Sequence, residues 1–234
     1  MSTVKTDAIE TRAGGTSVLT IGTATQTIKL PGGTPGAGKL LQSDADGDAS
    51  WATVANDVVL LSTQTASTSA SVNFDNTLIT SDYRTYDVRY MNVVGATDGV
   101  SLEMQFSDDN GSNFDSNHMN NMAVGYAGAG GSGLTNNPTN DSVLADHARF
   151  GADQSFDAGD SMGGTATIQN PSSTSSVTTY QNVSSHVTFN AANVYAYNTR
   201  IGGYWASLAA VNYIRFRMSS GDLATGIFQL WGYK

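Results

Sequence analysis

The chain has 234 residues, of which 39% are hydrophobic and 13% are charged, and its formal net charge at pH 7 is −9. An acidic balance argues against a nucleic-acid-binding protein, which carries a basic stripe. The absence of cysteine excludes disulfides and thiolate metal sites. The 25 glycines and the scarcity of helix-forming runs lead us to expect an all-β protein rich in turns.

The N-terminus lacks the apolar core of a secretion signal, and no stretch approaches the ~18 apolar residues that cross a bilayer. We therefore expect synthesis in a cytoplasm and no membrane insertion. If the protein acts outside the cell, we expect it to leave by another route, such as lysis.

The first 30 residues contain only two weak strand signals, at 17–21 and 26–30. This segment has too little apolar bulk to fold alone, so we expect it to be disordered or to be ordered by copies of itself or by another protein. Residues 39–42 read as a strand, followed by an Asp/Gly-rich tight turn and a short return to Trp51. We expect a domain boundary at 51–56, with an attachment and neck segment at 1–56 and a head domain at 57–234.

From residue 58 onward the chain is a series of short strands. The clearest covers 100–107, with apolar Val100, Leu102, Met104 and Phe106 alternating with polar residues. One buried face and one solvent-exposed face are typical of antiparallel sheets. Further candidate strands lie at residues 58–62, 71–74, 86–94, 166–171, 186–189, 194–197, 203–207, 214–218 and 226–233. Roughly eight to ten strands predict a jelly-roll-like antiparallel β-sandwich.

Residues 112–164 show no sustained hydrophobic period and overlap a strongly acidic region. Between positions 98 and 160 there are ten acidic residues and one basic residue, Arg149. The acidic residues are Asp98, Glu103, Asp108, Asp109, Asp115, Asp141, Asp146, Asp153, Asp157 and Asp160. This region is interpreted either as solvated polar loops or as a surface that binds divalent cations or tunes a contact electrostatically.

The last 21 residues predict two strands joined by a short Ser-Ser-Gly-Asp turn. In 214–218 the apolar side chains face one way, and Arg215 and Arg217 face the other. Residues 226–233 are apolar on nearly both faces, so this strand belongs inside a sandwich or an oligomer interface. We expect a closing hairpin, with both arginines as candidate partners for acidic loops of a neighbouring subunit.

The sequence resembles bacteriophage tail-fibre and receptor-binding proteins at three places. The C-terminal match comprises Ser220, Gly221, Gly226, Phe228, Leu230, Gly232 and Lys234. The neck match comprises Gly38, Lys39, Leu41, Ser43, Asp44, Gly47 and Trp51. Residues 6–14 are similar to the virion-docking start of phage fibres, which makes Thr6, Asp7 and Ile9 candidate virion-attachment residues. The resemblance also implies that short strands are hidden in 112–164.

The resemblance implies a homotrimeric, virion-located tail fibre that adheres to a host-surface glycan or protein. Its N-terminus would bind another virion protein, and assembly would take place in the infected host's cytoplasm. One alternative is a head fibre, capsid decoration or collar protein of the same architecture with no receptor role. A remoter alternative is a cellular carbohydrate-binding module or adhesin.

Asn120, Asn121 and Tyr126 are the candidate receptor-binding residues, because they fall in the stretch expected to form loops and rigid sandwiches present their loops for binding. A sugar-stacking platform is a second hypothesis, set against the alternative that these aromatics sit in the core or between subunits. Its members would be Tyr126, Tyr195, Tyr197, Tyr204 and Trp205.

We expect no enzymatic activity, metal site or cofactor. The histidines at 118, 147 and 186 lie in different segments without metal-ligand spacing. Asp146 directly precedes His147, and chain neighbours rarely form the pair that a catalytic site needs. No Gly-x-Ser-x-Gly nucleophile motif is present.

Overall fold

The computed structural model describes residues 39–43, 45, 49–53, 57–128, 131–137, 145–150, 160–190 and 193–234. The chain divides into two compact units, 1–55 and 56–234. In the first unit, β1 (Lys39–Ser43) and β2 (Ala49–Thr53) form an antiparallel hairpin in which Leu41 lies opposite Trp51. The predicted strand and its return to Trp51 are thus confirmed, whereas residues 44 and 46–48 of the predicted turn lie outside the described residues.

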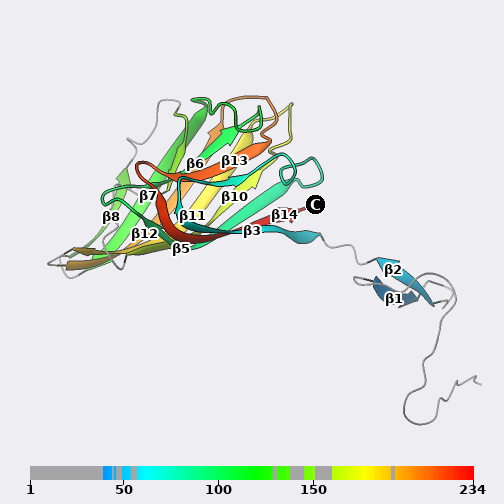
Figure 1. Cartoon of the computed structure of the whole chain (residues 1–234), viewed down its shortest axis with the longest axis horizontal. Helices are drawn as coiled ribbons and strands as arrows, with labels where there is room; N and C mark the ends of the chain where they lie inside the picture. Colours follow the sequence, from blue (N-terminus) through cyan, green and yellow to red (C-terminus); the bar gives the residue numbers. More distant parts are fainter. Residues whose placement is uncertain are drawn as a thin grey trace, which may run out of the picture. The chain divides into compact units, whose positions relative to one another are not determined.

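The second unit is a sandwich of two antiparallel sheets, which confirms the predicted all-β class (Figure 1). The larger sheet has the order β3 (Val58–Ser69), β14 (Leu223–Tyr233), β5 (Thr85–Gly95), β10 (Ser161–Gln169), β11 (Thr178–Asn190), β12 (Asn193–Trp205), β7 (His118–Gly128), β8 (Gly131–Asn137). The smaller sheet has the order β4 (Val72–Phe74), β13 (Tyr213–Met218), β6 (Leu102–Ser107), β9 (Ala148–Phe150). The described residues therefore form twelve sandwich strands, more than the eight to ten expected.

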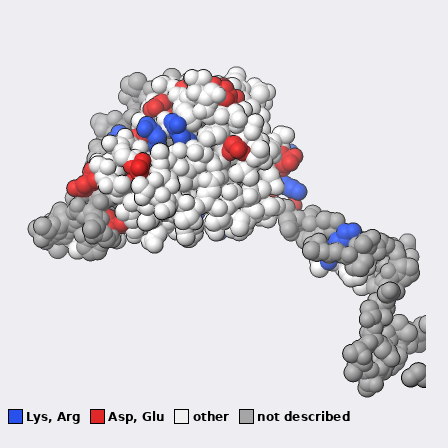
Figure 2. All heavy atoms as spheres, viewed as in Figure 1, with Lys and Arg blue, Asp and Glu red and all other residues white. Residues whose placement is uncertain are grey.

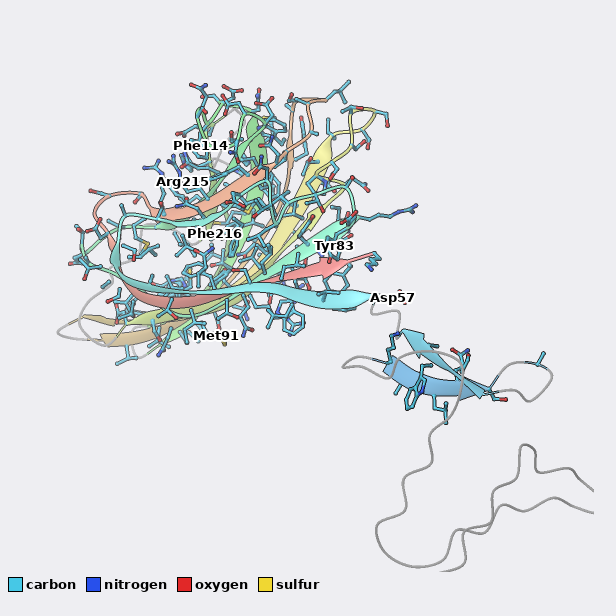
Figure 3. All side chains as sticks on the ribbon, turned by 45° about the vertical axis from the view of Figure 1, so that its right-hand side comes forward. Asp57, Tyr83, Met91, Phe114, Arg215 and Phe216 are labelled. Atoms are coloured by element: carbon cyan, nitrogen blue, oxygen red, sulfur yellow. The ribbon has the colours of Figure 1, made fainter. Side chains whose placement is uncertain are left out.

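The core lies between the two sheets and is built largely from aromatic rings. Phe216 of β13 faces Phe228 of β14 with 5.5 Å between ring centroids. Tyr90 of β5 stacks on Phe150 and Phe228, at 6.2 and 6.1 Å, and donates its hydroxyl to Asn182 Oδ1 at 2.7 Å. Figure 3 shows Phe216 between the layers and Met91 on the outer side of the larger sheet. Burying a polar hydroxyl with its partner satisfied lets the ring join the core without loss of stability.

The predicted C-terminal hairpin is wrong, although both of its strands exist. β13 pairs with β4 and β6 in the smaller sheet, whereas β14 pairs with β3 and β5 in the larger one. Stacked sheets lie about 10 Å apart, and the connection around Gly221 (φ +70°) spans that distance. The connection is fixed by Ser219 N–H donating to Ser101 O at 2.8 Å, and by Ala96 N–H donating to Asp222 O at 2.8 Å.

Residues 112–164 contain strands, as the resemblance implied, but one of them is long. β7 runs for 11 residues through an Asn-, Met- and Gly-rich sequence. His118, Met122 and Val124 are buried on its inner face, so the period of two is present but is carried by few strongly apolar side chains.

The sandwich has two distinct ends, which we call the base and the tip. At the base, the chain enters at Asp57 and finishes at Lys234, whose N–H donates to Asp57 O at 3.0 Å. At the tip lie the paired strand ends Gly128 with Gly131 of β7 and β8, and Asn190 with Asn193 of β11 and β12. The described residues include no helix long and apolar enough to span a membrane.

Candidate functional site

Aromatic side chains gather on the inner face of the larger sheet near the tip. His186, Tyr197 and Tyr126 lie in register on β11, β12 and β7. The His186 ring stacks on Tyr197 with 4.8 Å between centroids and 5° between planes, and Tyr126 lies 5.9 Å from Tyr197. Tyr195 lies 6.3 Å from Tyr126 and 6.1 Å from Tyr197. We call these four residues the aromatic cluster.

Glycines opposite two of the tyrosines make room for the aromatic cluster. Gly133 pairs with Tyr126, and a Cβ at Gly133 would lie 2.8 Å from the tyrosine hydroxyl oxygen. Gly128 pairs with Tyr195, and a Cβ there would lie 2.6 Å from the Tyr195 ring. An aromatic ring laid over a cross-strand glycine stabilises a sheet at a point where no side chain fills the space. The two glycines therefore determine where the Tyr126 and Tyr195 rings lie.

The cluster is neutral and partly exposed. All three tyrosines are partly exposed, and none of their hydroxyls has a hydrogen-bond partner among the described residues. Burial lowers the pKa of His186 to about 4, so its imidazole is uncharged at neutral pH. Burial, and then the neighbouring hydroxyls of Tyr195 and Tyr126, raise the pKa of Tyr197. β7, β8, β10, β11 and β12 contain a single Lys, Arg, Asp or Glu among them, namely Arg200.

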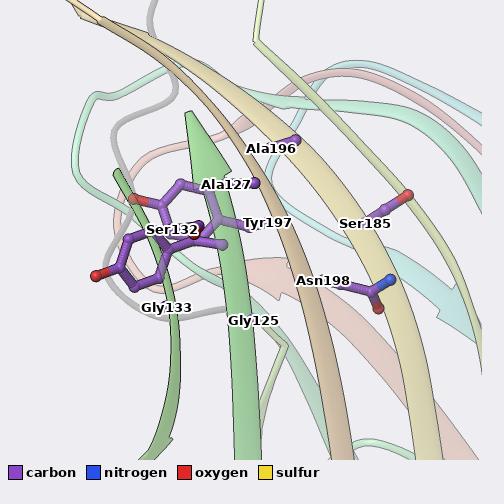
Figure 4. A pocket seen from close by; sticks show the side chains of 9 residues that line it. Gly125, Ala127, Ser132, Gly133, Ser185, Ala196, Tyr197 and Asn198 are labelled. Carbon is purple, nitrogen blue, oxygen red and sulfur yellow. The ribbon is translucent and has the colours of Figure 1, made fainter. Parts of the chain in front are cut away.

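The outer face of the same strands carries a shallow trough, shown in part in Figure 4. Its three connected depressions have volumes of about 690, 430 and 330 Å³ and share Ser185. Successive side chains of a strand point to opposite faces, so Ala196 and Asn198 line the trough while the Tyr197 ring belongs to the inner face. The trough is shallow because small residues face outward there: Gly125, Ala127, Ser132, Gly163, Ser185 and Ala196.

Arg215 and Arg217 both contact side chains of their own chain. Arg217 Nη2 lies 2.9 Å from Glu103 Oε2, and the Glu103 side chain is only 3% exposed. Arg215 donates to Gln105 Oε1 from Nε at 2.8 Å and from Nη2 at 2.6 Å. Its guanidinium also lies over the Phe114 ring, 3.5 Å from the centroid. Figure 3 labels the two residues close together. Within the chain, the attraction to the acidic region is seen in the Arg217–Glu103 pair, and a contact with a neighbouring subunit stays a prediction.

Asp146 and His147 do pair, contrary to the expectation for chain neighbours. His147 Nδ1 lies 2.7 Å from Asp146 Oδ1, and its Nε2 lies 3.4 Å from Glu103 Oε1. The nitrogen that a catalytic base would use therefore faces a carboxylate and not a nucleophile. Among the described residues, no group of three or more His, Asp or Glu side chains could hold a metal ion. The acidic positions 141, 153 and 157 lie outside those residues.

The three candidate receptor-binding residues lie on strand β7, so the prediction that they occupy loops is wrong. Asn120 accepts a hydrogen bond from the Tyr180 hydroxyl. Asn121 is exposed on the outer face, opposite Gly202, and Tyr126 belongs to the aromatic cluster. The structure therefore does not bring the three side chains together. The attachment candidates Thr6, Asp7 and Ile9 lie outside the described residues.

The predicted sugar-stacking platform is divided among three places. Tyr126, Tyr195 and Tyr197 do come together. Trp205 is fully buried in the core, and Tyr204 is 39% exposed at the base end of β12 on the outer face. Sequence reasoning missed His186, and the available signal was the two-residue spacing of Tyr195 and Tyr197, which places both rings on one face.

Comparisons with known proteins give no match to a family model, to a curated protein or to a solved structure.

Proposed function

We propose that this chain is a bacteriophage tail-fibre protein that assembles as a homotrimer and adheres to a host-surface receptor through the tip of its sandwich. The observation that carries the proposal is that the chain enters the sandwich at one end and the aromatic cluster lies at the other. The preceding chain joins it at Asp57 at the base, and the aromatic cluster lies at the opposite end of the larger sheet. A fibre anchored through its N-terminal segment would present that tip outward.

Several features near the tip suit recognition by a preformed surface. The tyrosines are held by register pairing and by glycine contacts, so they lose little conformational freedom on binding. Tyrosines combine an apolar ring with a polar hydroxyl, which is why they are enriched at interfaces. Figure 2 shows that most of the visible sandwich surface carries neither Lys or Arg nor Asp or Glu.

Self-association is supported by the outer face of the larger sheet near β3, β14 and β5. Ile227 pairs with Met91, and these two side chains are 38% and 43% exposed. Leu60 is 44% exposed and lies opposite Trp231, which stacks under Arg89 at 5.1 Å. These two exposed apolar pairs lie on one face of the sheet with the Gln229–Arg89 pair between them. Exposed apolar surface rimmed by polar residues marks an interaction site, and we assign this patch to a second copy of the chain. The number of three subunits rests on the resemblance to phage fibres.

The proposed mechanism is adhesive and not catalytic. Each head would make a weak, non-covalent contact, and several heads on one virion would convert these contacts into avid attachment. No catalytic residue is required for this role.

The location in the virion is tested by gold-labelled antibodies against the purified sandwich. We expect label at the tail tips of virions that carry this protein. Label on the capsid shell or the collar would contradict the proposal and favour the structural alternative.

A further inference from the structure

We propose that the aromatic cluster is a carbohydrate-binding site and that its ligand is an uncharged glycan. The inference rests on the proposed function for its biological setting, but the binding itself is a property of the purified protein. It assigns recognition to Tyr126, Tyr195 and Tyr197 on rigid strands, with His186 as a positioning residue.

The geometry of the three tyrosines suits a pyranose ring. Their centroids are 5.9 to 6.3 Å apart, and the rings are tilted or edge-on to one another and not stacked flat. The three therefore form a small angular surface that can meet more than one edge of a sugar. Apolar C–H faces of sugars pack on aromatic faces, and the cluster exposes part of each ring.

The polar groups of the cluster match the hydroxyls of a sugar. Each tyrosine hydroxyl can donate and accept a hydrogen bond, and none has a partner within the part of the chain that the structure describes. A sugar hydroxyl would satisfy such a group without the desolvation cost that a charged ligand carries.

The charge distribution favours a neutral ligand. Arg200 is the only Lys, Arg, Asp or Glu on β7, β8, β10, β11 and β12. It is exposed and pairs in register with Val183, on the outer face, whereas the cluster faces inward. Asp160, which immediately precedes β10, is 1% exposed. A sialylated or uronic-acid glycan would therefore find no matching cation on these strands.

His186 is the buried member of the cluster and holds the Tyr197 ring in place. It is 3% exposed and stacks flat on Tyr197, and neither ring nitrogen has a hydrogen-bond partner among the described residues. A stacked neutral ring fixes the plane of Tyr197, and therefore the angle that Tyr197 makes with Tyr126.

Ligand-observed saturation-transfer NMR on the full-length protein tests the inference. The neutral probes are glucose, galactose, N-acetylglucosamine and their β-linked disaccharides, and the charged comparison is N-acetylneuraminic acid. We expect transfer to at least one neutral probe, with single-site affinities of about 1 mM, and none to the charged sugar. Absence of transfer to the whole neutral set, or transfer to the charged sugar alone, would overturn the inference.

Variants locate the site. Tyr195→Ala and Tyr126→Ala should each weaken binding about fivefold, because an aromatic contact contributes ~1 kcal/mol. Tyr195→Phe keeps the ring packed and removes only the hydroxyl, so it should fold normally and bind more weakly than wild type. Tyr204→Ala is the matched control, an exposed tyrosine on the same strand but on the outer face at the base, and it should bind normally. Equal sugar binding by Tyr195→Ala and wild type would contradict the assignment. So would a loss of sugar binding in Tyr195→Ala that occurs only at protein concentrations at which the variant self-associates.

The two proposals fail separately. If no neutral sugar binds but the purified protein still blocks virion adsorption, the glycan inference is wrong and the adhesive function stands. If sugars bind at the cluster but the protein does not affect adsorption, the tail-fibre function is wrong and the cluster remains a carbohydrate site.

Discussion

Glu103 and Arg217 form an ion pair of 2.9 Å between neighbouring strands β6 and β13, with the Glu103 side chain almost fully buried. Removing Arg217 would take away the 2.9 Å partner of this buried carboxylate, with His147 left at 3.4 Å and Arg149 opposite Glu103 on β9. We expect Arg217→Met to lower the free energy of unfolding by about 3 kcal/mol, because the unpaired buried charge is costly. Urea denaturation followed by circular dichroism measures the change.

The double variant Glu103→Gln with Arg217→Met provides the control for this pair. Neutralising the carboxylate should recover much of the lost stability. Arg89→Met is a matched surface control, because Arg89 is exposed and stacks on Trp231, and it should cost less than ~1 kcal/mol. An Arg217→Met protein as stable as wild type would contradict the buried-charge account.

Gly202 and Gly203 are neighbours on β12 that should respond in opposite ways to alanine. A Cβ at Gly203 would overlap the Met119 carbonyl oxygen and lie 2.7 Å from the Tyr180 ring, whereas a Cβ at Gly202 would meet no atom of the described residues within 4 Å. We expect Gly203→Ala to destabilise the fold by about 2 kcal/mol through overpacking, and Gly202→Ala to be neutral or slightly stabilising. Thermal unfolding of the two variants side by side is the measurement. Equal melting temperatures would contradict the prediction, because both the Met119 backbone and the Tyr180 ring would then have moved aside without cost.

The burial of His186 predicts a loss of stability in acid. Its pKa is lowered to about 4 in the fold from 6.5, so the unfolded state binds the proton first and stability falls as pH drops through this window. The expected contribution is roughly 2 kcal/mol between pH 7 and pH 4.5. His186→Phe retains a ring against Tyr197 and removes the titration, so its melting temperature should vary less over that range. Burial also lowers the pKa of His118 to about 3, so wild type and His186→Phe both lose some stability in acid through His118. Identical pH profiles would contradict the prediction.

Self-association should depend on the outer patch of the larger sheet. Ile227→Lys places a charge in that patch without touching the core, and we expect it to convert trimers to monomers in sedimentation velocity experiments. Leu208→Lys is the matched control, since Leu208 is 55% exposed outside the strands and should not affect assembly. A wild-type protein that sediments as a 24.4 kDa monomer would refute the trimer itself.

The alternation of apolar and polar residues is enough to predict which side chains of several strands face the core. Ile214, Phe216 and Met218 are buried as their spacing implies, because the period of a strand is independent of its partners. The sheet that the next strand joins cannot be predicted in this way, because a short polar connection can form either a hairpin or a crossing between the two sheets. Sequence reasoning chose the hairpin, and the register of β14 with β3 and β5 overturns it.

The candidate site was only partly visible in the sequence. Tyr195 and Tyr197 share a face because they are two residues apart, but Tyr126 and His186 join them only through the pairing of β12 with β7 and β11. Such cross-strand register depends on contacts between segments far apart in the chain. The sequence predicts loops where β7 lies, because few of the inward side chains of that strand are strongly apolar.

The proposed adhesive function is tested most directly by competition for adsorption. Purified protein is added in increasing amounts to host cells before virions that carry this protein, and unadsorbed virions are counted. We expect adsorption to fall to a low plateau at saturating protein, and Tyr195→Ala to compete less effectively than Tyr204→Ala. Undiminished adsorption at saturating concentrations of the folded protein would contradict the proposal that the sandwich binds the host receptor.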